Sequence, residues 1–180
     1  EVNPLKALQA KMDGFEVMPF SQTLEMGDIY ISVTGNKHVI PGDSFLKMKN
    51  GAILSNSGHF DIEIDVQTLE KIAKNKRRIR WQLDEYTLNN EKKIYLCAEG
   101  RLVNLGAAEG HPSTVMSLSF CGQALALEYG MKKKLPGGLH VLPEEIDQRI
   151  ATLQLKAMGL KIDRLTEEQI TYMTSWHEGT

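Results

Sequence analysis

The residues best suited to binding chemistry lie in the stretch 99–113, whose sequence is EGRLVNLGAAEGHPS. Its polar members Arg101, Asn104 and His111 interrupt an otherwise apolar run. Inside a protein core these three side chains would need hydrogen-bond partners, whereas a loop in solvent would not need the apolar residues between them. The composition therefore predicts a site that binds a polar ligand just before a helix begins.

The elements that must position this stretch follow an alternating pattern. Short apolar strands are expected at residues 28–33 and 52–55, with a polar turn at 34–36 and a helix over 42–48 between them. Strands that alternate with helices form a parallel sheet. We therefore predict an α/β fold: a Rossmann-like, doubly wound parallel sheet, incomplete at its amino terminus, with a helical extension at the carboxyl terminus.

Further elements are expected on either side of these strands. Helices should begin at Pro4, Val66, Pro112, Leu142 and Thr166, and strands should cover residues 15–18, 79–86 and 94–97. The basic run 74–78 is expected to be a solvated turn, and Trp81 is expected to pack inside the fold. A hairpin made by the last two strands would bring the stretch 99–113 to the edge of the sheet at which the parallel strands end.

Ligands of open parallel sheets bind beyond the carboxyl ends of the strands, so the residues that follow each strand are candidates. These residues are Thr34-Gly35-Asn36 and the segment 56–61, NSGHFD. Glu1 is expected to follow an earlier strand, where an acidic side chain can accept hydrogen bonds from both ribose hydroxyls of an adenine nucleotide. The glycine-rich phosphate loop that accompanies such an acid is expected upstream of residue 1.

Composition limits the class of protein. The chain has 180 residues, of which 42% are hydrophobic and 24% are charged, with a formal net charge of -2. This balance favours a globular domain with no nucleic-acid partner. Cys97 and Cys121 lack metal-ligand or redox spacing, which is typical of a reducing compartment, and no metal site is expected. No apolar run reaches the roughly 20 residues of a membrane span, so a cytoplasmic location without a membrane partner is expected.

An ordered series of motifs resembles one known family, the S-adenosylhomocysteine hydrolases. The motifs are EVNP (1–4), ALQA (7–10), TG (34–35), SGHFD (57–61), EID (63–65), EGRLVNLG (99–106), GHPS (110–113) and LP (142–143). The resemblance implies that residues 1–111 form part of an NAD-binding domain of Rossmann type. It also implies that residues 112–134 form a hinge and crossover helix, and that residues 135–180 form an extension used in oligomerisation.

The activity implied by the resemblance is the NAD-dependent, reversible hydrolysis of S-adenosyl-L-homocysteine to adenosine and L-homocysteine. It proceeds through transient oxidation at C3′, elimination, water addition and re-reduction, so that NAD is regenerated in each turnover. One NAD tightly bound per subunit, a small-molecule substrate and a homotetramer belong to the same expectation. On its own, the 180-residue chain is expected to be inactive, because further catalytic residues and the phosphate loop belong to the upstream half.

Site residues are carried over by position within the matching motifs. His59 resembles the active-site histidine, and the pKa of an ordinary histidine lies near about 6.5, suited to acid–base work. Asn104 resembles the side chain that holds the nicotinamide carboxamide. Substrate binding is expected of His59, Leu102, Leu105, Gly110, His111, Met116 and Phe120. Cofactor binding is expected of Glu1, Lys6, Thr34, Gly35, Asn36, Ser57, Gly58, His59, Asn104 and His111.

Two departures from the family pattern leave alternatives open. Lys6 stands where the family commonly has an asparagine near the adenosine ribose of NAD, which alters that contact. Glu109 precedes Gly110-His111-Pro112, as in an archaeal-like branch with members that prefer S-inosylhomocysteine. One alternative is therefore an S-inosylhomocysteine hydrolase of the same family. Two others are an NAD-dependent 2-hydroxyacid dehydrogenase, which shares this type of NAD domain, and a catalytically inactive regulatory homologue that retains the fold.

Overall fold

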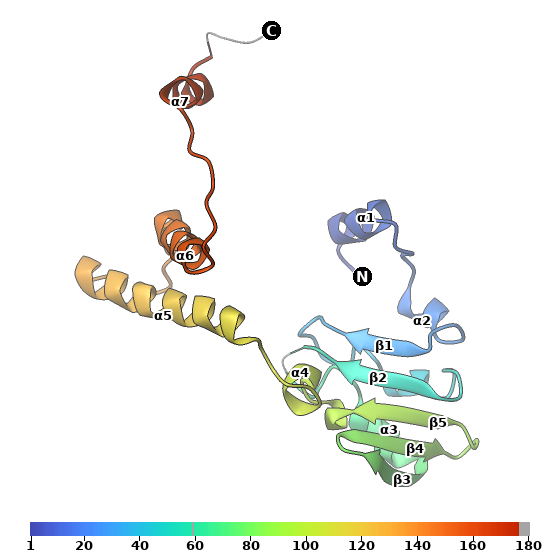
Figure 1. Ribbon diagram of the computed structural model, residues 1–180. Helices are drawn as coiled ribbons and strands as arrows, with labels where there is room; N and C mark the ends of the chain where they lie inside the picture. The colour runs from blue at the N-terminus through green and yellow to red at the C-terminus, as the bar shows by residue number, and fades with distance from the viewer. Residues whose placement is uncertain (59, 177–180) are drawn as a thin grey trace. The chain divides into compact units, whose positions relative to one another are not determined.

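A computed structural model describes residues 1–58 and 60–176 of the chain (Figure 1). The chain divides into two compact units, Glu1–His111 and Pro112–Thr180. The first unit contains the sheet, and the second consists of helices and their connections.

The first unit is built on a five-stranded sheet with the strand order β1-β2-β5-β4-β3. Its strands are β1 (Ile29–Ser32), β2 (Ala52–Asn56), β3 (Ala73–Arg80), β4 (Leu83–Leu88) and β5 (Lys93–Cys97). β1, β2 and β5 run parallel to one another, whereas β4 and β3 are antiparallel to their neighbours. The predicted α/β class with a Rossmann-like sheet is confirmed, and an antiparallel pair extends its parallel part.

Register across the sheet explains where the core lies. Tyr30 of β1 pairs with Leu54 of β2, which pairs with Leu96 of β5, and all three side chains are buried. Burial of such side chains stabilises each by about 1.5–3 kcal/mol relative to exposure. The core is completed by further residues of the strands and by residues of the connections and helices: Leu24, Ile40, Phe45, Met48, Ala52, Ile64, Leu69, Tyr86, Leu88 and Ile94.

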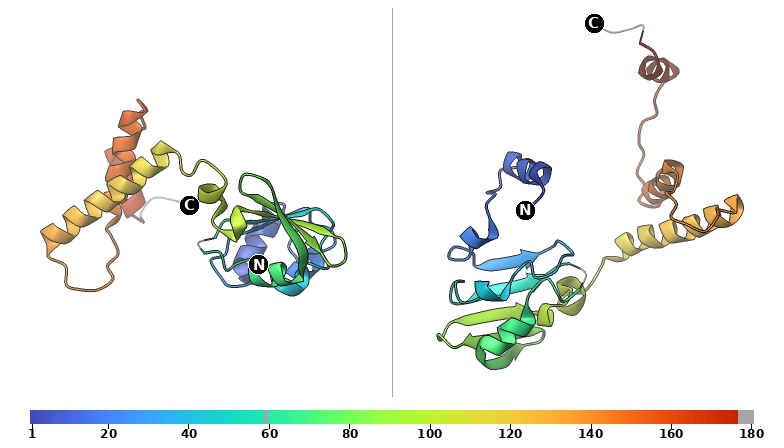
Figure 2. Two further views of the ribbon diagram at one scale, coloured as in Figure 1. Left: turned by 90° about the horizontal axis from the view of Figure 1, so that it is seen from below. Right: turned by 180° about the vertical axis from the view of Figure 1, so that it is seen from behind.

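Short helices connect or follow the strands of this unit. They are α1 (Pro4–Met12), α2 (Phe20–Thr23), η1 (Gly42–Ser44), α3 (Val66–Ile72), η2 (Ala98–Gly100) and α4 (Val103–Gly106). α1 begins as predicted, because Pro4 occupies its first turn and Asn3 Oδ1 accepts the backbone N–H of Leu5 at 2.9 Å. α3 contacts β3 and β4, and Figure 2 shows it on one face of the sheet.

Two predicted elements differ in the structure. Residues 15–18 form no strand, and the part of the chain that is described offers them no neighbouring strand with which to pair. The helix expected over 42–48 is instead a 3₁₀ turn, η1, followed by further turns. Phe45 and Met48 are nevertheless fully buried, so the apolar pattern was correct about burial and wrong about conformation.

The basic run 74–78 is a strand and not a solvated turn. It belongs to β3, and the strand expected over 79–86 is divided by a turn at Trp81 and Gln82. The ladder places Arg77 opposite Glu85 and Arg78 opposite Asp84. Each carboxylate is at most 4% exposed and receives an N–H donor from its arginine at 2.7 Å.

Because a buried charge needs a partner of opposite sign, the buried carboxylates of β4 require a cationic strand beside them. Tyr95 also donates its hydroxyl to Glu85 at 3.1 Å. The pKa of Glu85 is lowered to about 2, chiefly by the hydrogen bond from Arg77. These ion pairs join β3 to β4.

The edge strands β1 and β3 present different surfaces. Seven of the eight residues of β3 are exposed, and five of its residues are basic: Lys74, Lys76, Arg77, Arg78 and Arg80. β1 instead exposes Ile29 and Ile31, which alternate with the buried Tyr30 and Ser32. One edge is therefore cationic and the other apolar.

The second unit contains α5 (Ser113–Lys133), α6 (Glu144–Ala157) and α7 (Glu167–Thr174). Pro112 precedes α5 as its N-cap. The predicted capping at Thr166 is confirmed: Gln169 donates its backbone N–H to Thr166 Oγ1 at 3.2 Å, and Gln169 Oε1 accepts the N–H of Thr166 at 2.8 Å. Among residues 1–58 and 60–176, no helix is long and apolar enough to cross a membrane.

Candidate functional site

The three parallel strands end at the same edge of the sheet. β1 ends at Ser32, β2 ends at Asn56 directly opposite it, and β5 ends at Cys97. An isolated parallel bridge joins Asn56 to Leu102, so the chain that follows β5 lies beside the end of β2. The structure thus brings the stretch after Cys97 to the predicted edge, beside the segments that follow β1 and β2.

The side chain of Asn56 connects these segments. It is completely buried, and its Oδ1 accepts the backbone N–H of Gly58 at 2.7 Å. Its Nδ2 donates to the carbonyl oxygens of Phe60 at 2.7 Å and Gly100 at 2.9 Å. Ser32 Oγ lies 3.4 Å from Asn56 Oδ1 as a further donor. One amide therefore links the end of β1, the loop after β2 and the turn after β5.

Glu63 connects the loops that follow β1 and β2. Its side chain is buried, and its Oε2 accepts the backbone N–H of Thr34 at 3.1 Å and the hydroxyl of Thr34 at 3.2 Å. Its Oε1 accepts the backbone N–H of Gly35. A Cβ built on Gly58 would lie 1.6 Å from the same Oε1, so only glycine leaves room for the carboxylate.

The turn after β5 has an unusual backbone. Ala98, Glu99 and Gly100 have φ values of 50°, 57° and 83°, which are left-handed in all three. A non-glycine residue costs roughly 1–2 kcal/mol in this region, so other contacts must hold the turn. Arg78 donates to Glu99 Oε1, and Arg101 Nη2 lies 3.3 Å from Glu99 Oε2. The hydrogen bond from Arg78 lowers the pKa of Glu99.

Asn104 lies in α4, directly after this turn. Its Oδ1 is buried, and it is one of two buried side-chain polar atoms in the described residues without a hydrogen-bond partner. Its backbone carbonyl accepts the N–H of Gly110 at 2.8 Å, which folds residues 104–110 into a compact loop. A buried carbonyl oxygen without a partner leaves free energy to be gained from a donor on a ligand.

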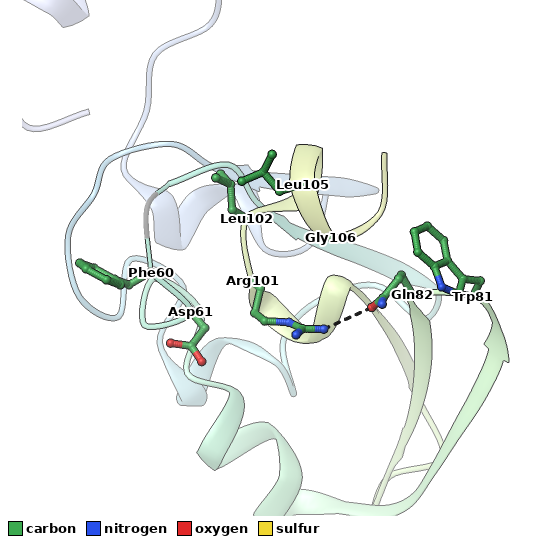
Figure 3. A pocket seen from close by; sticks show the side chains of 8 residues that line it. All are labelled: Phe60, Asp61, Trp81, Gln82, Arg101, Leu102, Leu105 and Gly106. Atoms are coloured by element: carbon green, nitrogen blue, oxygen red, sulfur yellow. Dashed lines mark hydrogen bonds between the residues drawn. The ribbon is translucent and has the colours of Figure 1, made fainter. Parts of the chain in front are cut away.

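A pocket of about 700 Å³ opens beside α4 (Figure 3). It is lined by Phe60, Asp61, Trp81, Gln82, Arg101, Leu102, Leu105 and Gly106. Leu102 and Leu105 were predicted to form an apolar wall, and both are found here. Trp81 was expected to pack inside the fold but is 68% exposed at the turn between β3 and β4. That turn lies near the end of β5, because Gln82 accepts the N–H of Ala98 at 2.9 Å.

Other predicted cofactor residues lie outside this cluster of contacts. Glu1 accepts the N–H groups of Val2 at 2.7 Å and Asn3 at 2.8 Å, and these bonds lower its pKa, with the bond from Asn3 contributing most. It lines a separate hollow with residues such as Glu16. Lys6 is exposed on α1. Their place in a cofactor site stays a prediction.

The remaining predicted residues have different positions in the chain. His59, predicted for catalysis and for both kinds of binding, lies outside the described residues. His111 is exposed at the end of the first unit, whereas Met116 and Phe120 belong to α5 of the second unit. Asn36 donates its N–H to Thr34 Oγ1 at 3.1 Å, and Ser57 donates its N–H to the carbonyl of Ser32 at 2.7 Å.

Two residues of this edge were given no role of their own by sequence reasoning, although Asn56 begins the candidate segment 56–61 and Glu63 belongs to the motif 63–65. Asn56 ends an apolar strand and Glu63 precedes a buried isoleucine, so each is a polar residue inside a buried pattern. That pattern was the available signal, since buried polar groups are paired. The sequence alone could not identify their hydrogen-bond partners, because the bonds of Asn56 and Glu63 reach residues up to 44 and 29 positions away.

Comparison with known proteins identifies a family. Residues 1–110 match the family described as S-adenosyl-L-homocysteine hydrolase, NAD binding domain. The match ends one residue before the boundary between the two structural units. It covers the sheet and all the contacts around Asn56, Glu63 and Asn104.

Curated relatives carry the name adenosylhomocysteinase. The chain is 56% identical over its whole length to the protein of Pyrobaculum aerophilum and 56% identical to that of Sulfurisphaera tokodaii. It is 54% identical to the protein of Aquifex aeolicus. The chain spans between 41% and 44% of the length of these relatives.

Proposed function

Because this chain belongs to the S-adenosyl-L-homocysteine hydrolase family, we propose that it forms the NAD-binding and carboxyl-terminal part of an enzyme that hydrolyses S-adenosyl-L-homocysteine. The proposed products are adenosine and L-homocysteine, and the reaction is reversible. The family assignment supports this reaction over that of a 2-hydroxyacid dehydrogenase. An NAD cofactor follows from the domain family that residues 1–110 match.

The observation that carries this proposal is the buried Oδ1 of Asn104, which has no hydrogen-bond partner among residues 1–58 and 60–176. A nicotinamide carboxamide offers an N–H₂ donor, which an amide oxygen can accept without changing its protonation state. Asn104 belongs to α4, and Leu102 and Leu105, which lie close to it in the sequence, line the pocket of about 700 Å³. An apolar pocket with a few oriented polar groups is the usual form of a nucleotide or nucleoside site.

The loops that follow β1 and β2 support the proposal. We assign Thr34, Gly35, Asn36, Ser57 and Gly58 to cofactor contacts, because Glu63 and Asn56 fix this backbone at the carboxyl ends of parallel strands. At Gly35 a Cβ would meet no atom within 4 Å, so this position allows a ligand to approach the main chain closely. The further proposed contacts to the cofactor are Glu1, Lys6, His59 and His111.

The chemistry that bound NAD supplies is reversible hydride transfer at C3′ of the nucleoside ribose. Asn104 would orient the nicotinamide end of the cofactor, while Leu102 and Leu105 exclude water from the nucleoside pocket. We propose His59 as an acid–base residue near C4′ and C5′, a role that contributes on the order of 10²–10⁴ in rate. The further proposed contacts to substrate are Gly110, His111, Met116 and Phe120.

The base of the substrate is a separate question. Glu109 precedes Gly110-His111-Pro112, which leaves hypoxanthine as an alternative to adenine. The test uses the complete polypeptide with S-adenosyl-L-homocysteine and, separately, S-inosyl-L-homocysteine. Release of nucleoside and homocysteine is measured together with absorbance of enzyme-bound NADH.

The outcomes of this test separate the alternatives. Adenosine release with an NADH signal supports the proposal. If only inosine is released, the substrate is S-inosyl-L-homocysteine and the proposed reaction is otherwise the same. NAD binding without an NADH signal or product from either substrate would assign the protein to the inactive regulatory homologues. A protein that binds no NAD would contradict the cofactor assignment as well.

We also propose that residues 112–134 act as a hinge and crossover helix and that residues 135–180 support a homotetramer. In the second unit, large apolar side chains of α5 and α7 are exposed, including Phe120, Leu127 and Met173. Exposed apolar surface of this extent is typical of interaction sites. Sedimentation of the complete polypeptide, with and without residues 135–180, tests this: loss of the tetramer on truncation is expected.

A further inference from the structure

We propose that Asn56 is a positioning residue for the cofactor, which sets the loop after β2 and the turn after β5 in the arrangement that NAD requires. This inference rests on the proposed NAD site. Asn56 itself is completely buried, so it acts through the residues that it holds. What it holds is the backbone at the ends of two neighbouring parallel strands, β2 and β5.

The hydrogen bonds of Asn56 use the whole amide. Oδ1 accepts from Gly58 N–H at 2.7 Å and faces Ser32 Oγ at 3.4 Å, while Nδ2 donates to two carbonyls, those of Phe60 and Gly100. An asparagine side chain has two lone pairs and two N–H groups, so all four are occupied. An amide is the group that can accept on one side and donate twice on the other without a charge.

Two of these contacts lie on either side of position 59. Gly58 donates its N–H to Asn56, and Phe60 presents its carbonyl to the same side chain. The loop after β2 is therefore bound to Asn56 at two points. Glu63 fills the space beside Gly58 from another direction, so this loop is held from two sides.

The third contact controls the approach to Asn104. Gly100 is the last residue of the left-handed turn, and its carbonyl accepts from Asn56 Nδ2 at 2.9 Å. Leu102 then forms the bridge to Asn56, and α4 with Asn104 begins at the following residue. A shift at Gly100 is therefore passed through the three residues 101–103 to Asn104, whose oxygen is proposed to receive the carboxamide.

The substitution Asn56→Asp separates positioning from packing. It keeps the size of the side chain and the acceptor for Gly58 N–H. It replaces Nδ2 by a carboxylate oxygen, which repels the carbonyls of Phe60 and Gly100. The control is Leu88→Val, a fully buried position at the opposite end of the sheet, where β4 pairs with Ala73.

The complete polypeptide is used for both variants, and the NAD dissociation constant is measured by titration below both melting transitions. We expect Asn56→Asp to weaken NAD binding by at least about tenfold, the result of losing about 1.4 kcal/mol. Leu88→Val should lower the melting temperature and leave NAD binding unchanged. Equal NAD affinity of the two variants would overturn the inference, whereas a wild-type protein that binds no NAD would overturn the proposed function instead.

A second measurement needs no substitution. If Asn56 sets the loop in advance, the Gly58 amide of the wild-type protein is protected from hydrogen exchange before NAD is added. We expect its exchange, followed by NMR, to be slowed by at least about tenfold relative to an open amide. Exchange at the open rate without NAD, followed by protection when NAD is added, would show that the cofactor orders the loop and that Asn56 does not.

Discussion

The carboxylate of Glu63 occupies the place that a side chain at Gly58 would need. The distance from Glu63 Oε1 to a Cβ built on Gly58 is 1.6 Å, far below any contact between real atoms. The same carboxylate accepts the N–H groups of Thr34 and Gly35. A single buried acid therefore sets the spacing between the loops after β1 and β2.

The first prediction concerns this spacing. Gly58→Ala should displace Glu63 and weaken NAD binding by about tenfold or more, because Thr34 and Gly35 lose their common acceptor. The measurement is the NAD dissociation constant of the complete polypeptide.

Adding Glu63→Asp, which shortens the carboxylate side chain, should restore part of the affinity and give a non-additive double-mutant cycle. Gly137→Ala serves as the control, since its Cβ would meet no atom within 4 Å. Strict additivity of Gly58→Ala and Glu63→Asp would contradict the shared role of these residues.

The second prediction concerns the unpaired oxygen of Asn104. Asn104→Leu removes a buried acceptor that has no partner in the described residues, so the unfolding free energy without NAD should stay the same or rise. NAD affinity should fall by about tenfold, because the carboxamide loses its acceptor. Thermal melting with and without saturating NAD measures both effects. If the variant were stabilised by NAD as strongly as the wild type, Asn104 would have no role in cofactor binding.

The third prediction concerns acid stability. The ordinary pKa of a glutamate is 4.5, and the pKa of Glu85 is lowered to about 2 in the fold, chiefly by Arg77. A lowered pKa stabilises the fold fully above pH 4.5, and this contribution is lost as the pH falls from about 4.5 to about 2.

In Arg77→Gln the pKa of Glu85 should rise, so the variant should be less stable than the wild type near neutral pH. The difference should shrink as the pH falls towards 2. Urea midpoints between pH 2 and pH 7 measure it, and a difference independent of pH would show that the pair does not control this titration.

The fourth prediction concerns the left-handed turn after β5. Gly100 has φ +83°, and a Cβ there would lie 2.8 Å from Val66 Cγ2. Gly100→Ala combines backbone strain with a close contact, so it should destabilise the protein by about 1–3 kcal/mol. Denaturant unfolding measures this, with Gly137→Ala as the reference. An unchanged midpoint would mean that the turn relaxes without cost.

Most strands of the sheet could be predicted from the sequence, because periodic apolar residues report burial directly. The strands at 28–33, 52–55 and 94–97 were predicted close to their observed bounds. Burial of Phe45 and Met48 was also foreseeable, although their 3₁₀ conformation was not. The pattern of apolar residues therefore predicts burial more reliably than it predicts the local backbone conformation.

The ion pairs of β3 and β4 could not be foreseen for a different reason. A basic run is ordinarily solvated, and only the cross-strand register shows that Arg77 and Arg78 meet the buried Glu85 and Asp84. The candidate site also contains residues that the sequence could indicate and residues that it could not. Asn104 was found through its motif, whereas Asn56 and Glu63 gain their meaning from partners that are remote in sequence.

The contrast between the two edge strands has a consequence for growth of the sheet. At β3, an incoming strand would meet a row of cations on an exposed strand, a surface that discourages edge-to-edge association. At β1, the described residues provide a pairing partner on one side only, and Ile29 and Ile31 are exposed. The sheet is thus extendable in one direction, and unwanted aggregation of the isolated chain should begin at β1.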